Sequence, residues 1–277
     1  MADIFDQMLS RYEIHTTDDK RNAMHEVIQQ ITLAGLYRGQ FFNKAAFYGG
    51  TCLRIFHGLQ RFSEDMDFSL LQPDVNFSIE NYFNSIESEF KALGRKIEIV
   101  KKIKKGDSNI ESAFLKDNTE IYNIQFQTTP SIKIKLEVDT NPPLQFQTEH
   151  KFLLLPFSFM AQCFTLPALF AGKMHAFLFR NWRNRVKGRD WYDFEWYIRN
   201  NIPLNFNHFL ERTHQSEKIS NENIGTNQVK ELLKKIIAKT DIDMVKADVR
   251  PFLKEQKDIE IWTTNYFLQL VDMIQFK

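Results

Sequence analysis

The chain of 277 residues contains only two cysteines, Cys52 and Cys163, which lie far apart and show no CxxC spacing. This excludes a disulfide framework and a zinc knuckle as the basis of the fold. The 7 histidines form no HxH or HxxxH pair, so no histidine-rich metal site is expected. The low cysteine content is typical of a protein in a reducing compartment, and we expect a cytoplasmic location.

Targeting and membrane segments are also missing from the sequence. The start, MADIFDQ, lacks the basic residues followed by an apolar run that would indicate a signal peptide. The most apolar run, FLLLPFSFMAQCFTLPALFAG, is interrupted by two prolines and a glutamine. We therefore predict a buried strand, a loop and the start of a core helix there, and no membrane partner.

The chain has almost no net charge, +1 at pH 7, so any affinity for nucleic acid must come from local clusters. What it does have is aromatic residues: they make up 14% of the sequence and include 26 phenylalanines. This composition excludes a disordered tail and predicts a globular protein with a substantial core. The length fits one large domain or two ordinary ones.

Hydrophobic periodicity divides the chain into a mixed first part and a helical second part. Apolar residues recur with helical spacing in 18–37, and the turn that follows 45–48 leads into a short helix. Strands are predicted near 63–71 and, from alternating polarity, in 96–104, 120–128 and 131–140, with a helix at 78–94 between the first two. The later helices are predicted at 172–183, 190–199, 227–238 and 258–276. We predict an α+β fold whose sheet is antiparallel or mixed, with domains at 1–165 and 166–277.

Two aspartates, Asp65 and Asp67, stand one residue apart in the strand SEDMDFSLL. Because strand side chains alternate, they share a face with Ser63, and Met66 and Phe68 point to the core. Carboxylates about 6 Å apart repel by about 3 kcal/mol at an effective dielectric constant near 20, although a fully solvated face would reduce this below 1 kcal/mol. A pair of oxygen ligands with no nearby histidine or cysteine suits Mg²⁺ or Mn²⁺.

A third acidic ligand is predicted on the strand SIKIKLEVDT. Its polar face carries Glu137 in mid-strand and Asp139 near the end, and Glu137 is the preferred candidate. The alternative for Glu137 is an ion pair with the lysines beside it. A metal site formed by Asp65, Asp67 and Glu137 is therefore the hypothesis.

The turn Gly49-Gly50-Thr51 precedes a helix, and glycines there let the backbone approach a phosphate that the helix N-terminus favours. A hydroxyl from Thr51 could add a contact. A glycine turn alone indicates no more than a tight turn. Followed about 15 residues later by an Asp-x-Asp strand, it indicates a site for a nucleoside triphosphate and its metal ions.

The whole stretch GGTCLRIFHGLQRFSEDMDFSL resembles the first motif of the AbiEii/AbiGii toxin family, within the nucleotidyltransferase superfamily. The resemblance implies a nucleotidyltransferase-type mixed sheet with flanking helices, followed by a helical half. It also implies catalytic roles for Asp65 and Asp67. Nucleotide-binding roles are implied for Ser63 and for Arg54 and Arg61, which could alternatively pair with acidic residues or helix carbonyls.

A second stretch, GKMHAFLFRNWRNRVKGRDWYDFEWYI, is similar to the later motifs of the same family. This implies that Lys173 binds the triphosphate or stabilises its charge. Either Asp190 or Asp193 is implied as its polar partner, and the sequence leaves the choice open. Asp190 near a helix start could also be a simple cap.

The family resemblance implies a metal-dependent nucleotidyltransferase (EC 2.7.7-type) that transfers a nucleoside monophosphate from an NTP and acts as a toxin beside a separate antitoxin. RNA, in particular tRNA, is the expected acceptor, and clustered cations favour it. The weak RNA-binding candidates are Lys101, Lys102, Lys104, Lys105, Arg180 and Arg183. Two alternatives stay open: adenylylation of a small molecule or protein, and a non-catalytic nucleotide-binding module.

Overall fold

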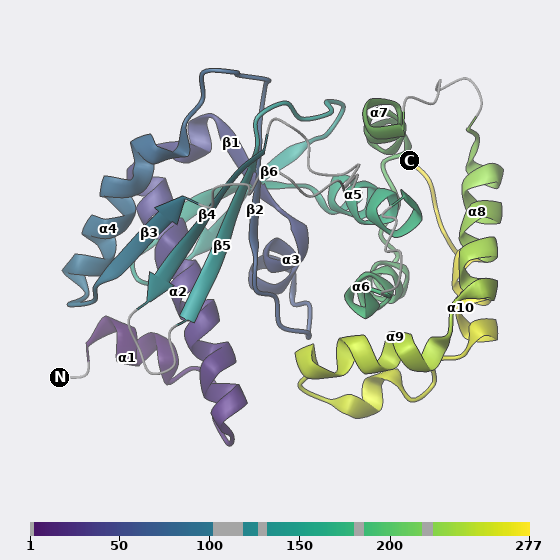
Figure 1. Cartoon of the computed structure of the whole chain (residues 1–277), viewed down its shortest axis with the longest axis horizontal. Coiled ribbons are helices and arrows are strands. Elements are labelled where there is room, and N and C mark those ends of the chain that lie inside the picture. The colour runs from purple at the N-terminus through teal and green to yellow at the C-terminus, as the bar shows by residue number, and fades with distance from the viewer. Residues whose placement is uncertain (1–2, 102–118, 127–131, 180–185, 218–223) are drawn as a thin grey trace, which may run out of the picture. The chain divides into compact units, whose positions relative to one another are not determined.

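The computed structural model describes residues 3–101, 119–126, 132–179, 186–217 and 224–277 (Figure 1). The chain forms two compact units. Unit 1 consists of Met1–His57, Glu64–Pro142 and Thr148–Cys163, and unit 2 of Gly58–Ser63, Pro143–Gln147 and Phe164–Lys277. The division predicted from the sequence did not anticipate the two short segments that unit 2 takes from the predicted first domain, residues 1–165.

In the part of the chain that the structure describes, seven strands form one sheet in the order β3-β4-β5-β2-β1-β7-β6. β1 lies antiparallel to β2 and parallel to β7, β2 is parallel to β5, and β3, β4 and β5 are antiparallel. The sheet is therefore mixed, which confirms the predicted α+β class. The strands are β1 Ala45–Tyr48, β2 Met66–Leu70, β3 Ile97–Lys101, β4 Thr119–Phe126, β5 Ile132–Asp139, β6 Thr148–Leu153 and β7 Phe159–Phe164.

The long apolar run begins within β6, continues through β7 and ends inside a helix, so it contains parts of two strands where one was predicted. Pro156 lies between the two strands, where a proline does not interrupt a ladder of hydrogen bonds. No described helix is long and apolar enough to cross a membrane.

In the described part of unit 1, the helices are α1 Ile4–Leu9, α2 Thr17–Arg38, α3 Gly49–His57 and α4 Phe83–Ala92. α2 is the predicted helix 18–37, and it begins where Thr16 and Asp19 cap each other's backbone N–H groups. α2 packs against α4, beside which it runs in Figure 1. α3 connects β1 to the segment before β2 and contacts both strands.

Aromatic side chains fill the core of unit 1. Phe41, Phe47 and Phe68 are fully buried, and the ring of Phe68 lies 5.0 Å from each of the other two, centroid to centroid. Met66 is buried on the same side of β2 as Phe68. The apolar face of this strand is therefore the one that alternation predicts, which leaves Asp67 on the other face.

Unit 2 is helical. Its helices are α5 Leu166–Phe179, α6 Gly188–Arg199, α7 Phe206–Glu217, α8 Thr226–Lys239, α9 Ile242–Val249 and α10 Thr264–Asp272. α5 starts earlier than predicted because Pro167 is tolerated in a first helical turn. The prediction of one helix over 258–276 was wrong: Thr263 caps α10 through Tyr266 N, and Phe276 forms a bridge with Leu204.

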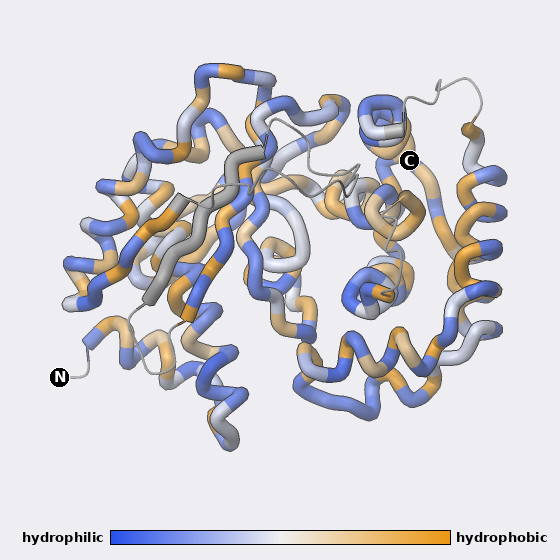
Figure 2. Tube along the Cα trace, viewed as in Figure 1, coloured by the Kyte–Doolittle hydropathy of each residue, from blue (hydrophilic) through white to orange (hydrophobic). Residues whose placement is uncertain are grey.

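α6 occupies the centre of unit 2 and packs against α5, α9 and α10. On one side, the buried carboxylate of Glu195 accepts hydrogen bonds from Trp262 Nε1 (2.7 Å) and Tyr266 Oη (2.6 Å). At the edge of the unit, α8 is amphipathic: Figure 2 shows its hydrophobic residues along one side, where Val229, Leu233 and Ile237 are buried.

Candidate functional site

The turn between β1 and α3 brings Gly49 against the carboxylate of Asp67. Gly49 has a φ of 82°, in the left-handed region, and a Cβ added there would overlap the Oδ2 atom of Asp67. The neighbouring residue, Tyr48, is the cross-strand partner of Asp67. The position therefore requires glycine for two reasons, and the carboxylate lies directly beside the backbone of the glycine turn.

Thr51 connects the same turn to the segment before β2. Its side chain is fully buried, and its hydroxyl donates a hydrogen bond to the backbone carbonyl of Asp65. This contact ties the glycine turn to the residue that precedes β2. A phosphate contact through the Thr51 hydroxyl, as predicted, would have to compete with this bond.

Glu137 lies opposite Asp67, because β2 and β5 are parallel neighbours and these two residues are register partners. Neighbouring strands lie about 4.8 Å apart, and both side chains are half-buried. The carboxylate of Glu137 also forms an ion pair with Lys135 on its own strand, which is the alternative that the sequence left open.

Asp139, the other candidate for the third acid, lies opposite Ser69 and not opposite Asp67. It is buried, and its Oδ1 accepts a hydrogen bond from Asn141 N at 3.2 Å. This is the geometry of an Asx turn that ends the strand. The register therefore favours Glu137 as the partner of the Asp67 carboxylate.

The donor set of Asp65, Asp67 and Glu137 contains only carboxylate oxygens and is half-buried. Among the described residues, no group of three or more His, Cys, Asp or Glu side chains is close enough to hold a metal ion. Mg²⁺ is usually bound by one or two carboxylates together with waters and substrate phosphates, not by an all-protein cage. The chemistry of two carboxylates beside a glycine turn, which can approach a phosphate, therefore fits Mg²⁺.

Arg54, a predicted nucleotide ligand, is engaged inside unit 1. Its Nε and Nη2 donate to the two oxygens of Glu26 on α2, at 2.9 and 3.0 Å. Glu26 is buried. Glu26 was not predicted from the sequence, because it lies within a helix whose apolar spacing gives no reason to single out one acidic residue. The bidentate pair joins α2 to α3 and favours a structural role for Arg54.

His25, one helical turn before Gln29 on α2, lies in the electrostatic field of Asp65. The pKa of His25 is lowered to about 4, mainly by burial and also by Arg21, and Asp65 acts in the opposite direction. Gln29 donates from Nε2 to the carbonyl of Glu64 at 3.1 Å. One face of α2 therefore supports the segment that enters β2.

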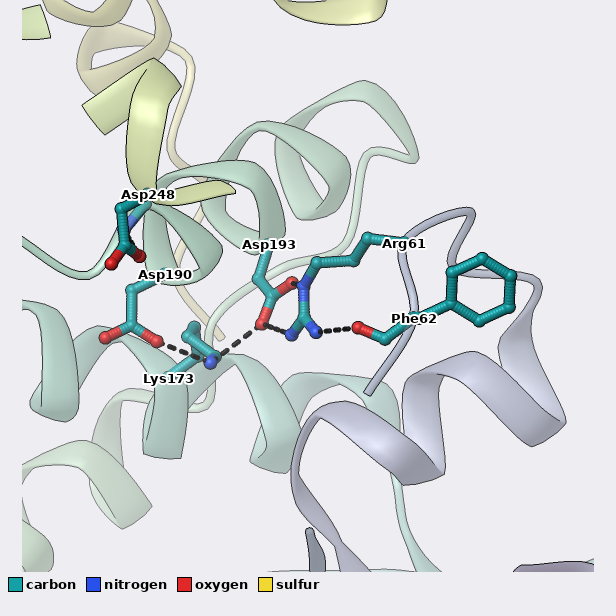
Figure 3. Close-up of polar contacts among 7 residues, drawn as sticks. Arg61, Phe62, Lys173, Asp190, Asp193 and Asp248 are labelled. Atoms are coloured by element: carbon teal, nitrogen blue, oxygen red, sulfur yellow. Dashed lines mark hydrogen bonds and ion pairs between the residues drawn. The ribbon is translucent and has the colours of Figure 1, made fainter. Parts of the chain in front are cut away.

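A second group of charged residues lies in unit 2. Lys173 projects from α5, and Asp190 and Asp193 project from α6. The ammonium group of Lys173 lies 2.7 Å from Asp190 Oδ1 and 2.7 Å from Asp193 Oδ2 (Figure 3). The sequence left open which aspartate pairs with the lysine, and both do. Their i, i+3 spacing on one helix makes this possible.

Arg61 completes this group. Its Nε and Nη2 donate to Oδ1 and Oδ2 of Asp193, each at 2.6 Å, and its Nη1 donates to the carbonyl of Phe62 at 2.9 Å. Its side chain is only 2% exposed. Nucleotide binding by Arg61 therefore stays a prediction, and the burial of the Arg61 side chain does not favour it. The observed contacts fit the alternative, in which Arg61 pairs with an acidic residue.

Charge compensation decides the protonation state of the buried aspartate. Burial by itself would raise the pKa of Asp193, but the charges and hydrogen bonds of Arg61 and Lys173 outweigh it, and the pKa lies below its usual value. Burial opposes the charge of Arg61, yet Asp193 raises the pKa of the guanidinium. Both groups are therefore ionised at neutral pH.

The start of α6 is positioned by α9. Asp248 Oδ2 accepts a hydrogen bond from Gly188 N at 2.8 Å, and it lies beside this group in Figure 3. A side chain at Gly188 would overlap the carbonyl oxygen of Val245. Neither Val245 nor Asp248 was predicted from the sequence, because no helix was expected at α9. They fix the helical turn that carries Asp190.

The other predicted site residues are Gly50, Ser63 and the RNA-binding candidates. Gly50 is the second residue of α3, and Ser63 is buried at the end of the segment 58–63 of unit 2. The RNA-binding candidates lie outside the described residues, except for the backbone of Lys101 at the end of β3. These candidates are Lys102, Lys104, Lys105, Arg180 and Arg183.

The family model of the nucleotidyl transferase AbiEii toxin, of type IV toxin–antitoxin systems, matches residues 31–271. The chain belongs to this family. The resemblance stated from the two motifs is therefore confirmed, and with it membership among the nucleotidyltransferases. The matched residues include Asp65, Asp67 and Glu137 in unit 1 and Lys173, Asp190 and Asp193 in unit 2. The family assignment therefore covers both units.

The structure is similar to that of JHP933 from Helicobacter pylori, with a TM-score of 0.53 and 17% sequence identity over 91% of this chain and 89% of that one. At this identity the likeness supports the fold. A second H. pylori protein, described as a candidate nucleotidyltransferase, has a TM-score of 0.47 at 17% identity over 90% of this chain and 88% of its own. No curated protein matches the chain.

Proposed function

We propose that this AbiEii-family protein transfers a nucleoside monophosphate from an NTP to an acceptor hydroxyl and releases pyrophosphate. One observation carries the proposal: Asp67 lies against the backbone of Gly49 and opposite Glu137 in the sheet. A half-buried acidic pair beside a glycine turn is suited to a polyphosphate that arrives with its own cations. Family membership supports the same reaction class.

In this proposal, Asp65, Asp67 and Glu137 would hold Mg²⁺ or Mn²⁺, which supplies charge neutralisation on the phosphate oxygens when bound. The turn Gly49-Gly50 presents backbone to the triphosphate without side-chain obstruction. Binding requires Glu137 to exchange its ion pair with Lys135 for a new partner. Positioning and charge compensation then provide most of the rate, as in other phosphoryl transfers.

Lys173 is assigned to stabilise negative charge on the triphosphate. Its side chain is 14% exposed, so a limited part of it can meet a ligand, and Asp190 and Asp193 hold the ammonium group in one orientation. Because both aspartates contact it, neither is assigned alone. A compact ammonium ion can contact a phosphate oxygen at low cost in reorganisation when its position is already set.

For the acceptor we propose RNA, with tRNA as the first candidate, and a toxin role beside an antitoxin. The family supports the toxin role and an antitoxin partner. The acceptor rests on the sequence alone, on the basic clusters around Lys101 and Arg180. RNA binding through these clusters should weaken steeply with salt in a gel-shift assay, and the absence of any shift at low salt would remove RNA from the proposal.

The deciding experiment incubates the protein with each α-³²P-labelled NTP and with RNA, protein and metabolite fractions, each with and without Mg²⁺ or Mn²⁺. We expect label in RNA, and loss of at least about 100-fold in the Asp67→Asn variant because charge neutralisation at the phosphate is lost. Asp74→Asn is the matched control, since Asp74 is also half-buried in unit 1 and its carboxylate accepts a hydrogen bond from a local amide, Asn76 N.

The outcomes separate the candidate functions. Label in protein or metabolites and not in RNA would support adenylylation of those targets. Nucleotide binding without any transfer would support a non-catalytic module. Transfer by Asp67→Asn at the rate of Asp74→Asn would contradict the assignment of Asp67.

A further inference from the structure

Arg61 is a cation buried inside unit 2 with every nitrogen of its guanidinium engaged. Nε and Nη2 bind the two oxygens of Asp193, and Nη1 binds the carbonyl of Phe62. An arginine that serves as a phosphate ligand needs donors that reach the ligand. Arg61, at 2% exposure, has its donors directed into the protein.

The contacts of Asp193 show what Arg61 does to its neighbours. Oδ2 of Asp193 is shared between Nη2 of Arg61 and Nζ of Lys173, at 2.6 and 2.7 Å. The carboxylate plane is fixed by the two parallel bonds to Arg61, so the oxygen that Lys173 meets has a defined position. Lys173 is therefore held by one aspartate that Arg61 orients and by a second, Asp190.

The balance of charges in this group also depends on Arg61. The group has two cations, Arg61 and Lys173, and two carboxylates, Asp190 and Asp193, all buried or nearly so. Without Arg61, a fully buried carboxylate would keep a single cation, and its ionised form would be strongly disfavoured. Asp193 would then take up a proton more readily, and Lys173 would lose one of its two anionic partners.

The backbone around Arg61 is also fixed within unit 2. Phe62 N donates to the carbonyl of Phe252 at 2.8 Å, and Arg189, next to Asp190, stacks its guanidinium 4.1 Å from the ring of Phe252. Phe252 thus contacts both the segment that carries Arg61 and the helix that carries Asp193. Arg61 has little freedom to leave Asp193 for a ligand.

We propose that Arg61 is a positioning residue: by binding both oxygens of Asp193 it holds this carboxylate in one orientation, and so sets the position of Lys173. This inference rests on the proposed function for its catalytic meaning. It replaces the nucleotide-binding role that the sequence motif alone implies for Arg61.

The test measures Lys173 itself, in the full-length protein. The rate at which acetic anhydride acetylates Lys173 is followed by mass spectrometry from pH 6 to pH 9 in wild type, Arg61→Lys and Arg61→Gln. Loss of the oriented carboxylate frees the motion of the Lys173 side chain and lets the reagent reach its amine, so we expect acetylation of Lys173 to accelerate at least about threefold at pH 7.5 in Arg61→Gln. Arg61→Lys, which keeps the charge without the bidentate geometry, should give an intermediate rate.

Glu195→Gln is the matched control. Glu195 is a buried carboxylate on the same helix, two positions after Asp193, but it binds Trp262 and Tyr266. Its substitution perturbs α6 without touching Lys173, so the acetylation rate should stay at the wild-type value. Equal acceleration in Glu195→Gln and Arg61→Gln would reduce the role of Arg61 to general helix stability and overturn the proposal, and so would an unchanged rate in Arg61→Gln.

A second measurement separates this inference from the proposed function. In the nucleotidyl transfer assay, Arg61→Lys should lower kcat about tenfold or more and change KM for the NTP less than about threefold, because no ligand contact is removed. A raised KM with unchanged kcat would make Arg61 a nucleotide ligand after all. If wild type transfers no nucleotide, the proposed function fails, but the acetylation rates still decide whether Arg61 positions Lys173.

Discussion

Asp65 and Asp67 in unit 1 and Asp190 and Asp193 in unit 2 are two aspartate pairs that the chain holds in different ways. Asp65 and Asp67 are half-buried at the start of β2, where the backbone of Gly49 and the hydroxyl of Thr51 support them. Asp190 and Asp193 are buried on α6 and meet Lys173 and Arg61. The first pair is positioned by backbone packing and the second by opposite charge.

The difference has a physical consequence. Carboxylates that keep contact with water can bind and release a cationic ligand without a large desolvation cost, whereas buried carboxylates must be neutralised permanently by the protein. The pair on β2 is therefore suited to a ligand that comes and goes. The pair on α6 is suited to hold a fixed cation, Lys173, in place.

The largest expected effect concerns the removal of one carboxylate from each pair. Asp193→Ala leaves the buried guanidinium of Arg61 without its bidentate partner, so we expect a loss of about 3–5 kcal/mol in the free energy of unfolding. Asp65→Ala removes a half-buried charge and should change stability by less than about 1 kcal/mol. Denaturant unfolding measures both, monitored by circular dichroism for the two units together and by tryptophan fluorescence for unit 2, which contains all four tryptophans. Similar losses in the two variants would contradict the contrast between the pairs.

A smaller effect tests the support that backbone packing gives to Asp67. Gly49→Ala forces a left-handed φ of 82° on an L-residue and overlaps the carboxylate, and we expect it to cost about 2–3 kcal/mol. Gly94→Ala is the control in the same unit, with a φ of 67° but no atom near the added Cβ, and should cost about 1–2 kcal/mol. Thermal unfolding compares them. If the two variants lose equal stability, the contact between Gly49 and Asp67 has no energetic weight.

The smallest effect is a difference in pH dependence. The pKa of His25 is lowered to about 4 by burial, so between pH 6.5 and 4 the unfolded chain binds a proton that the folded chain does not. This group alone should therefore lower stability by about 1–2 kcal/mol as the pH drops from 7 to 5, and His25→Gln should remove that part of the loss. His57, whose pKa burial also lowers to about 4, contributes a similar part that His25→Gln leaves in place. The exposed His150 provides the control variant His150→Gln, which should keep the wild-type dependence.

Asp193 should behave differently from His25 in the same pH titration. The pKa of Asp193 is lowered below its usual value, near 3.8, so its contribution is complete above that pH and is lost only as the pH falls further. Between pH 7 and 5, the Asp193→Ala variant should therefore show the same loss as wild type. A change in that slope would mean that Asp193 titrates near neutrality and that Arg61 does not compensate its charge.

Much of the local structure follows from the sequence because local periodicity specifies it. The helix α2, the strand β5 and the helix α6 lie where alternation or helical spacing predicts them, and Met66 and Phe68 are buried as the strand pattern requires. The two motifs also identified the family, since they combine a glycine turn with acids at fixed spacing. The helices α7 and α9 were missed because each has a short apolar face that only neighbouring helices define.

Pairing between distant residues could not be predicted. Arg54 and Arg61 occupy comparable places in one motif, yet the first binds Glu26 and the second binds Asp193, on helices far away in the sequence. A charged side chain alone carries no information about its partner, because burial and neighbours decide whether an arginine meets a ligand or a carboxylate. The same applies to Asp190 and Asp193, which share Lys173.

The sequence by itself determined the strongly periodic elements such as α2, β5 and α6, the core face of β2, the family and the list of charged residues worth testing. These depend on spacing along the chain, which a single sequence records. The tertiary structure decided which charges are neutralised inside the protein and which keep contact with water. It placed Glu137 opposite Asp67 and Arg61 against Asp193, because strand register and helix packing join residues that no local pattern connects.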